Sequence, residues 1–292
     1  MTDSTSPGPT VRRTELITPD PAEALAGVLD IEPPPAAEGL APLWHWIYLL
    51  ERRAQSELGP DGHPLTGVPA PPGPGRLRMF AGGRVTAYGT LRFGAPATRT
   101  TRVVSSVEKQ GRSGPLTFVT TRSEIEQDGT VVVADEQDIV YRAAGSTLPP
   151  SPAGSAPPAG SASPAGVGER SDVRLELDVD PVLLFRFSAL TYNAHRIHYD
   201  HDYTRLEGYP DLVVHGPLQA LLMGEAMRRS GTPLVDRTFS YRLVAPTYGA
   251  QRLTVAAAGA RTGEELLEAQ VLDGSGIVTA TSRLEPADRP RP

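Results

Sequence analysis

The chain has 292 residues, enough for about two compact domains, and its formal net charge is −6. An acidic balance argues against a dedicated nucleic-acid-binding protein. The absence of cysteine excludes disulfides, thiolate metal sites and thiol nucleophiles, and leaves nothing that indicates secretion. No segment has the ~18 uninterrupted apolar residues of a membrane-spanning helix. A cytoplasmic protein is therefore expected.

The chain starts with MTDSTSPGPTVRR, which lacks the apolar segment of a signal peptide. Residues 1–15 are expected to form a disordered leader. Helical spacing predicts two short helices after it, over Pro21–Asp30 and Leu43–Arg53. Strands are indicated where apolar residues alternate with polar or small ones, at Val85, Ala87, Leu91 and Phe93, at Val173, Leu175, Leu177 and Val179, and at Leu253, Val255 and Ala257.

Residues 143–170 consist almost entirely of Pro, Ala, Gly and Ser. Such a composition cannot build a core and is typical of a flexible linker. We expect this linker to separate an N-terminal repeat, residues 16–142, from a C-terminal repeat, residues 171–287.

The two halves share a motif, because LRFGAP at Leu91–Pro96 and YRLVAP at Tyr241–Pro246 both contain Arg-x-x-Ala-Pro. Each copy is followed by an Asp-Gly hairpin signal, Asp128-Gly129 in one half and Asp273-Gly274 in the other. The same order of motifs favours duplication of one unit rich in strands.

A long amphipathic helix is predicted over Gly216–Ser230, with Pro217 suited to its first turn. A helix of this length, roughly 22 Å, can cover the apolar face of a sheet. The predicted fold is α+β: two antiparallel sheets, each curled around a helix, arranged as a double hot-dog that forms a pseudo-dimer in one chain.

Four of the six histidines lie between His195 and His215, bracketed by apolar segments. This concentration indicates the polar lip of a cleft. The alternative is a loop of hydrogen-bonded histidines without a catalytic role.

The segment Leu190–Asp200, LTYNAHRIHYD, resembles the active-site segment of MaoC-like hydratases and dehydratases. The resemblance is greatest to their mesaconyl-CoA hydratase and hydroxyacyl-thioester dehydratase branch. Two further segments fit that branch: Val213–Gly216, which leads into the long helix, and Met79–Val85, MFAGGRV. The resemblance covers nearly the whole chain apart from the leader and the linker.

The resemblance implies a catalytic histidine preceded, five residues earlier, by an aspartate, with an asparagine between them. His198 occupies the histidine position, but Asn193 replaces the aspartate and His195 replaces the asparagine. An amide cannot take up or release a proton at ordinary pH, so the sequence leaves the acid–base partner of His198 open.

The implied reaction is the reversible hydration of an α,β-unsaturated acyl thioester, giving a 3-hydroxyacyl thioester. His198 is expected to be the general base, Asn193 to hold the water or hydroxyl, and His195 to be the second proton donor. The backbone N–H of Gly216, at a helix start, is expected to bind the thioester oxygen.

Four more residues are assigned to the substrate site. Asp200 is expected to fix an imidazole tautomer, and Arg242 to contact the phosphates of coenzyme A. Tyr199 is expected to line the acyl tunnel or pack in the core, and His215 to border the cleft.

No cofactor and no metal are expected beyond the thioester carrier, which is coenzyme A or an acyl-carrier protein. Neither nucleic acid nor membrane is expected as a partner, and the protein is expected to be a monomeric pseudo-dimer or a homodimer. Two other functions remain open, a non-catalytic acyl-thioester-binding module and a hot-dog thioesterase. A zinc site is the chemical competitor, with five possible ligands in His195, His198, Asp200, His201 and Asp202.

Overall fold

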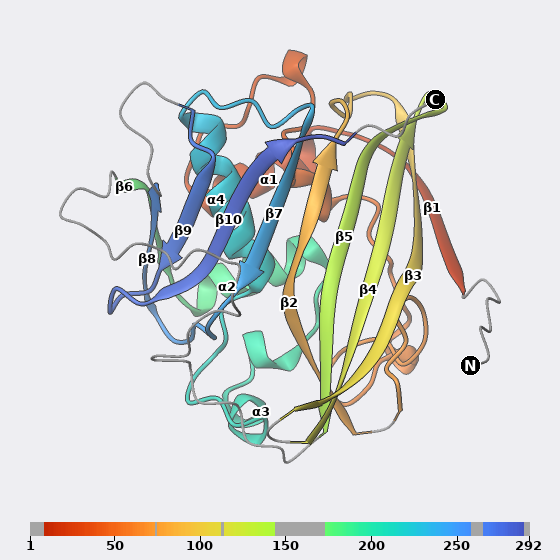
Figure 1. Cartoon of the computed structure of the whole chain (residues 1–292), viewed down its shortest axis with the longest axis vertical. Coiled ribbons are helices and arrows are strands. Elements are labelled where there is room, and N and C mark those ends of the chain that lie inside the picture. The colour runs from red at the N-terminus through yellow and green to blue at the C-terminus, as the bar shows by residue number, and fades with distance from the viewer. Residues whose placement is uncertain (1–8, 74, 112–113, 144–172, 258–264, 289–292) are drawn as a thin grey trace.

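The computed structural model of the chain describes residues 9–73, 75–111, 114–143, 173–257 and 265–288. Within these ranges the strands are β1 (Thr10–Leu16), β2 (Arg76–Ala87), β3 (Pro96–Gly111), β4 (Gly114–Gln127), β5 (Thr130–Ala143), β6 (Val173–Val179), β7 (Arg237–Leu243), β8 (Gln251–Ala257), β9 (Glu268–Leu272) and β10 (Val278–Pro286). They form one antiparallel sheet in the order β1-β3-β4-β5-β2-β7-β10-β9-β8-β6 (Figure 1).

The strand order is the same in both halves when it is followed outwards from the middle of the sheet. In each half the second strand lies at the centre, followed by the fifth, fourth, third and first. This arrangement is that of a double hot-dog fold. The expected pair of sheets is thus joined edge to edge into a single sheet.

The junction between the halves is the antiparallel pairing of β2 with β7, from Gly82 opposite Arg242 to Ala87 opposite Arg237. Two glycines make the close approach possible. A side chain at Gly82, whose φ is +152°, would overlap the Tyr241 carbonyl oxygen, and a Cβ at Gly83 would lie 2.8 Å from the Tyr241 hydroxyl. Glycine lacks the Cβ that would prevent this contact.

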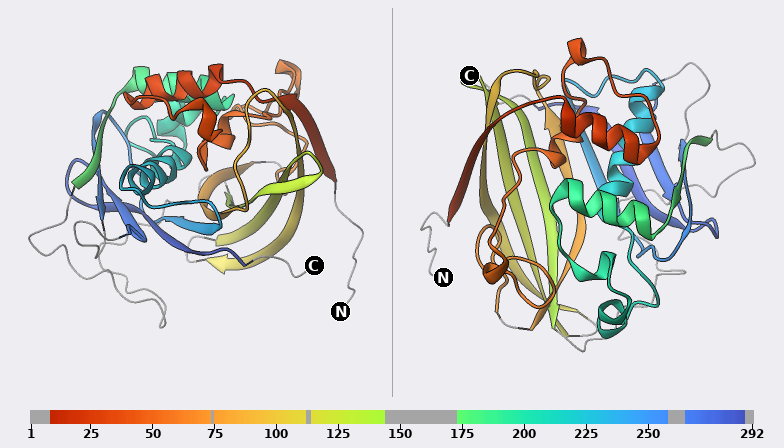
Figure 2. Two further views of the ribbon diagram at one scale, coloured as in Figure 1. Left: turned by 90° about the horizontal axis from the view of Figure 1, so that it is seen from above. Right: turned by 180° about the vertical axis from the view of Figure 1, so that it is seen from behind.

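The α-helices of the described chain are α1 (Asp20–Leu29), α2 (Pro181–Thr191), α3 (His201–Leu206) and α4 (Gly216–Arg229). The longest, α4, matches the helix predicted over residues 216–230. It lies in the hollow of the curved sheet, with α1 and α2 on its other side (Figure 2). Its side chains are buried on nearly every face, as expected of a helix enclosed by the core. None of these helices is long and apolar enough to cross a membrane.

The helix predicted over Leu43–Arg53 is wrong. Only a single 3₁₀ turn forms there, over Trp44–Ile47, between two residues with left-handed backbone, Leu43 (φ +74°) and Leu49 (φ +55°). Tertiary contacts override the helical propensity, because the indole Nε1 of Trp46 donates a 2.8 Å hydrogen bond to Asp135 on β5. The long strands of the first half therefore curve over an irregular segment instead of a long helix.

The start of the chain also differs from expectation. The predicted disordered leader included residues 10–15, but Thr10–Leu16 form β1, which pairs with β3 from Thr10 opposite Arg102 to Leu16 opposite Pro96. The strand was not predicted because polar and charged residues such as Arg12 and Arg13 give it no apolar alternation. It is an edge strand in which exposed and half-buried side chains alternate. Residues 1–8 lie outside the described part of the chain.

Both hairpins predicted from Asp-Gly pairs are present. Asp128 (φ +51°) and Gly129 (φ +75°) form a two-residue turn between β4 and β5. The second connection is longer, since Asp273 accepts hydrogen bonds from the backbone of Ser275 and Ile277 before β10 begins at Val278.

The strand predicted from the alternation of Val85, Ala87, Leu91 and Phe93 is shorter than expected. It ends at Ala87, and Leu91 makes an isolated bridge with Leu40.

The linker predicted over residues 143–170 falls almost wholly on residues 144–172, which lie outside the described part of the chain. We expect a protease to cut within residues 144–172, where Pro, Ala, Gly and Ser dominate. The halves should stay together after cleavage, because the β2–β7 pairing and the shared core hold them. Size-exclusion chromatography of the nicked protein checks this, and separation of the two fragments under native conditions would contradict it.

Candidate active site

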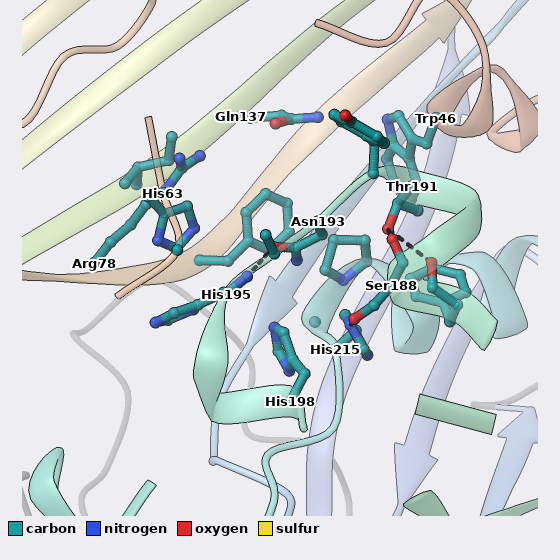
Figure 3. Close-up of a pocket in the computed structure, with 18 of the residues that line it drawn as sticks. Trp46, His63, Arg78, Gln137, Ser188, Thr191, Asn193, His195, His198 and His215 are labelled. Carbon is teal, nitrogen blue, oxygen red and sulfur yellow. Dashed lines mark hydrogen bonds between the residues drawn. The ribbon is translucent and has the colours of Figure 1, made fainter. Parts of the chain in front are cut away.

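A cavity of about 940 Å³ lies between the two halves of the chain. This volume is at the upper end of the range of small-molecule sites. Five of the six histidines line it, namely His45, His63, His195, His198 and His215. The cluster predicted from residues 195–215 is thus enlarged by two histidines from the first half. Figure 3 shows that His195, His198 and His215 surround the same space as Asn193, with His63 and Arg78 beyond them.

His198 is held in one tautomer by the backbone. It lies in a short 3₁₀ turn, Arg196–His198, and its Nδ1 donates a 2.7 Å hydrogen bond to the carbonyl oxygen of Val213. A carbonyl can only accept, so Nε2 carries the lone pair. In the described part of the chain Nε2 has no hydrogen-bond partner. Burial, with smaller contributions from His215 and His195, lowers the pKa of His198 well below its usual value. The ring is therefore a neutral base at physiological pH.

His215 supports His198 directly. The two rings stack with their centroids 3.6 Å apart and their planes 19° from parallel. His215 Nε2 is hydrogen-bonded to the hydroxyl of Ser188 on α2 at 2.9 Å, and Phe187 packs edge-on against the ring. Burial, assisted by His195, lowers the pKa of His215 to about 3. A neutral ring in this place fixes the plane of His198 without competing for its proton.

Asn193 and Gly216 present hydrogen-bond donors to the cavity. The side-chain oxygen of Asn193 accepts from the backbone N–H of His195 at 3.0 Å, which leaves its NH₂ group as a donor. Gly216 is the first residue of α4, and within the described chain its N–H makes no hydrogen bond. Pro217 follows and has no N–H. A Cβ at residue 216 would lie 2.6 Å from Leu243 Cδ1 and 3.0 Å from Phe80 Cδ1, so glycine fits the packing there.

A buried carboxylate that the sequence did not indicate lies beside His195. Glu207 is 5% exposed, and its Oε1 accepts a 3.3 Å hydrogen bond from His195 Nε2. Arg142 anchors the same residue through a 3.0 Å bond to its carbonyl oxygen. Position 193 carries an amide, but a carboxylate is still present behind the neighbouring histidine.

The first half contributes a second carboxylate–histidine pair. His63 Nδ1 donates to Asp61 Oδ2 at 3.2 Å, and the His63 ring lies 4.2 Å from that of His195. Burial alone raises the pKa of Asp61, but the hydrogen bonds from His63 outweigh it and lower the value to about 2. Burial lowers the pKa of His63 to about 3. The pair is thus a carboxylate beside a neutral imidazole.

The loop that carries this pair is docked on the catalytic segment. The backbone N–H of Arg196 donates to the Asp61 carbonyl at 2.9 Å, and its guanidinium donates to the Pro60 carbonyl at 3.0 Å. Gly62 directly follows Pro60 and Asp61 with φ +89°, and a side chain there would overlap the carbonyl oxygen of Ala194. A segment of the first half therefore sets the position of residues 194–196.

Of three further residues assigned to the site from the sequence, Asp200 and Arg242 are placed differently, whereas Tyr199 borders the cavity as expected. Asp200 does not fix an imidazole tautomer, which is the role of the Val213 carbonyl; instead it caps α3 and pairs with Arg196 at 2.6 Å. Tyr199 lines the cavity and donates to the Ala194 carbonyl at 3.1 Å. Arg242 is exposed on β7 and does not border the cavity, so its contact with coenzyme A stays a prediction that the cavity does not support.

The five residues of the alternative zinc site do not converge. His198 Nδ1 is bound to a carbonyl oxygen, and the side chains of Asp200, His201 and Asp202 pair with Arg196, Asp211 and Arg205. A different group, Asp61, His63 and His195, has its possible ligand atoms within 4.8 Å of one another. Within this group His63 donates to Asp61, and His195 Nε2 is already bonded to Glu207.

Comparison with known proteins identifies the family. The family model for hydroxyacyl-thioester dehydratase type 2 matches residues 43–249. The chain belongs to this family. Hydro-lyase activity towards an acyl thioester, expected from the resemblance, is thereby confirmed, as is membership of the hydratase and dehydratase branch.

Three relatives illustrate the match. The chain is 44% identical over 285 residues to the mesaconyl-C(4)-CoA hydratase of Chloroflexus aurantiacus, which covers 94% of this chain and 96% of the relative. A MaoC-like dehydratase from Phytophthora capsici superposes with a TM-score of 0.60 at 12% identity, covering 96% of each chain. A Mycobacterium tuberculosis protein described as a double hotdog fold gives 0.53 at 16% identity, covering 97% of this chain and 96% of that one. The two structures confirm the fold.

Replacing Gly62 by alanine tests the docking of the first half on residues 194–196. We expect Gly62→Ala to lower the unfolding free energy by more than the ~1–2 kcal/mol of a left-handed non-glycine residue, because the loop must also move away from Ala194. Hydratase kcat/KM should fall at least about 10-fold. Gly94→Ala is the matched control, since Gly94 has φ +78° and no atom within 4 Å of a Cβ. Equal losses in both variants would contradict the docking role.

The neutral histidines predict how stability depends on pH. His63 and His215 have folded-state pKa values of about 3, below the unfolded value of ~6.5. Between these values the unfolded chain binds more protons, so stability decreases as pH falls below about 6.5. Each ring contributes up to ~1.4 kcal/mol per pH unit once the unfolded ring is protonated. Urea denaturation between pH 7.5 and 5 measures this slope, and His215→Gln should reduce it. An unchanged slope in that variant would contradict the prediction.

Proposed function

We propose that the chain catalyses the reversible hydration of a short, branched enoyl-coenzyme A of the mesaconyl-C(4) type. Support comes from the relative of that name, which aligns along almost the whole of both chains. The observation that carries the chemistry is His198, a neutral imidazole whose Nδ1 is bound to the Val213 carbonyl. It lies in the same cavity as Asn193 and Gly216.

In the proposed mechanism the NH₂ group of Asn193 donates to the oxygen of a water molecule. Nε2 of His198 takes one proton from this water while its oxygen bonds to the β-carbon. The electron pair of the C=C bond moves towards the thioester oxygen. The N–H of Gly216 and the positive end of the α4 dipole stabilise the resulting charge.

The α-carbon then requires a proton, and His195 is the proposed donor. Its hydrogen bond to Glu207 balances the positive charge on the ring before the transfer. The proton left on His198 returns to His195 through solvent, which restores both residues. In the dehydration direction the same groups act in reverse. The mechanism uses only water and side-chain or backbone groups of this chain.

Coenzyme A is the proposed carrier, and an acyl-carrier protein is the alternative that a parallel assay distinguishes. A cytoplasmic location and a pseudo-dimeric monomer or homodimer stay predictions. The two other functions remain as outcomes of the test: a thioesterase would release free thiol, and a binding module would catalyse neither reaction.

The test is an assay of purified protein with mesaconyl-C(4)-CoA, following the loss of enoyl-thioester absorbance and the release of thiol in parallel. We expect hydration without thiol release. His198→Ala should lower kcat by about 10²- to 10⁴-fold, the usual contribution of a general base, with an unchanged circular dichroism spectrum.

His201→Ala is the matched control, because His201 is exposed, lies in the same segment and pairs only with Asp211. Its activity should equal that of the unmodified protein. Thiol release as fast as hydration, or near-normal turnover by folded His198→Ala, would overturn the assignment.

A further inference from the structure

A cationic side chain without an acidic partner lines the cavity. Arg78 is on β2, two residues before Phe80, and both side chains border the cavity. Among the described residues none forms an ion pair or a hydrogen bond with the Arg78 guanidinium. The Asp61 carboxylate interacts electrostatically with Arg78. Its hydrogen bond is made with His63. A half-buried guanidinium that lines a cavity and has no hydrogen-bond partner in the described part of the protein is free to bind an anionic group of a ligand.

The wall of the cavity formed by the first half carries apolar side chains, such as Met79 and Phe80, and a group of polar side chains on β3, β4 and β5. Some of these polar groups bond to each other, since the hydroxyls of Thr101 and Ser123 are 2.8 Å apart and Gln137 Nε2 donates to Asp135 at 3.0 Å. The Arg78 guanidinium has no such partner within the described ranges, and a polar acyl group can supply one. The polar residues that line this wall are Arg99, Thr101, Thr121, Ser123 and Gln137.

The register of the sheet separates Arg78 from the other unpaired arginine of the wall. In the strand register, Arg78 lies opposite Tyr141 on β5. Arg99 on β3 lies opposite Ile125 on β4, which in turn lies opposite Val133 on β5. Tyr141 and Val133 are eight residues apart on one strand, or roughly 26 Å at ~3.3 Å per residue. The two arginines thus lie at opposite ends of the chamber.

The end that contains Arg78 is the catalytic end. Arg78 lies beside His63 (Figure 3), and the His63 ring contacts that of His195 at 4.2 Å. One carboxylate, that of Asp61, acts electrostatically on Arg78. At least two, among them those of Asp135 and Glu51, act on Arg99. The guanidinium with fewer carboxylates near it is therefore the one close to the reacting carbons.

We infer that Arg78 binds a free carboxylate of the acyl group and makes the enzyme selective for α,β-unsaturated dicarboxylic monothioesters. This rests on the proposed function. In a mesaconyl-C(4) group the carboxylate is attached to the β-carbon, so its partner must lie near the catalytic histidines. A guanidinium suits this role, because its planar fork binds a carboxylate through two parallel hydrogen bonds. The contact also orients the β-carbon towards the attacking water.

The test compares two substrates that differ in this carboxylate, mesaconyl-C(4)-CoA and crotonyl-CoA. Arg78→Gln should lower kcat/KM for mesaconyl-C(4)-CoA by about 10- to 100-fold, the loss expected for a charge-assisted contact of ~1.5–3 kcal/mol. Its kcat/KM for crotonyl-CoA should change by less than about 3-fold. Arg78→Lys keeps the charge without the fork and should fall between the wild type and Arg78→Gln.

Arg99→Gln is the matched control at the far end of the same wall, and it should affect both substrates equally. A selective loss in Arg99→Gln, or an equal loss for both substrates in Arg78→Gln, overturns the inference. If Arg78→Gln does not fold, two substrates of the wild type provide the test. We expect its kcat/KM for the methyl ester of the mesaconyl carboxylate to be at least about 10-fold lower than for the free acid. Equal rates for ester and acid overturn the inference.

Failure of the proposed function gives a different result. If the wild type hydrates mesaconyl-C(4)-CoA but Arg78→Gln loses activity equally on both substrates, the carboxylate inference is overturned while the proposed function stands. If the wild type does not hydrate mesaconyl-C(4)-CoA, the proposed function itself is wrong.

Discussion

The pairing of β2 with β7 is the interaction on which the active site depends. It turns ten strands into one sheet and places the cavity between the halves. Aromatic rings cover the junction, because Tyr241 stacks on Phe80 at 6.0 Å and contacts Trp46 edge-on at 5.7 Å. The absence of a Cβ at Gly83 leaves room for the Tyr241 hydroxyl. A slip in this register would move the cavity wall relative to the catalytic segment.

Features with a local signal were predictable from the sequence. Helix α4 followed from apolar periodicity and from Pro217 in its first turn, and the hairpin at Asp128-Gly129 from its residues. The cluster of histidines after residue 190 indicated the candidate site from the sequence alone. Helix α2 was missed although Asp180 and Pro181 are a cap and a first-turn proline; Asp180 accepts from the Leu183 N–H at 2.7 Å.

Features that depend on distant contacts were not predictable. Trp46 belongs to a helical pattern, but its bond to Asp135, nearly ninety residues away, determines the backbone there. Glu207 lies among polar residues, and nothing in its spacing from His195 indicates a hydrogen bond. The pair Asp61 and His63 lies in a loop without helical or strand periodicity, so no sequence pattern marked it. No local pattern relates these residues to a segment more than a hundred residues further on.

In the described part of the first half, no long helix lies on the concave side of the sheet, and this leaves the strands to line the chamber. In the proposed mechanism, proton transfer belongs to the second half and recognition of the acyl carboxylate belongs to the first. Substitutions on β3, β4 and β5 can reshape the chamber while the segment from Asn193 to Gly216 keeps its hydrogen bonds. In this proposed division of roles, a change in the acyl group that is bound need not disturb the side chains that transfer protons.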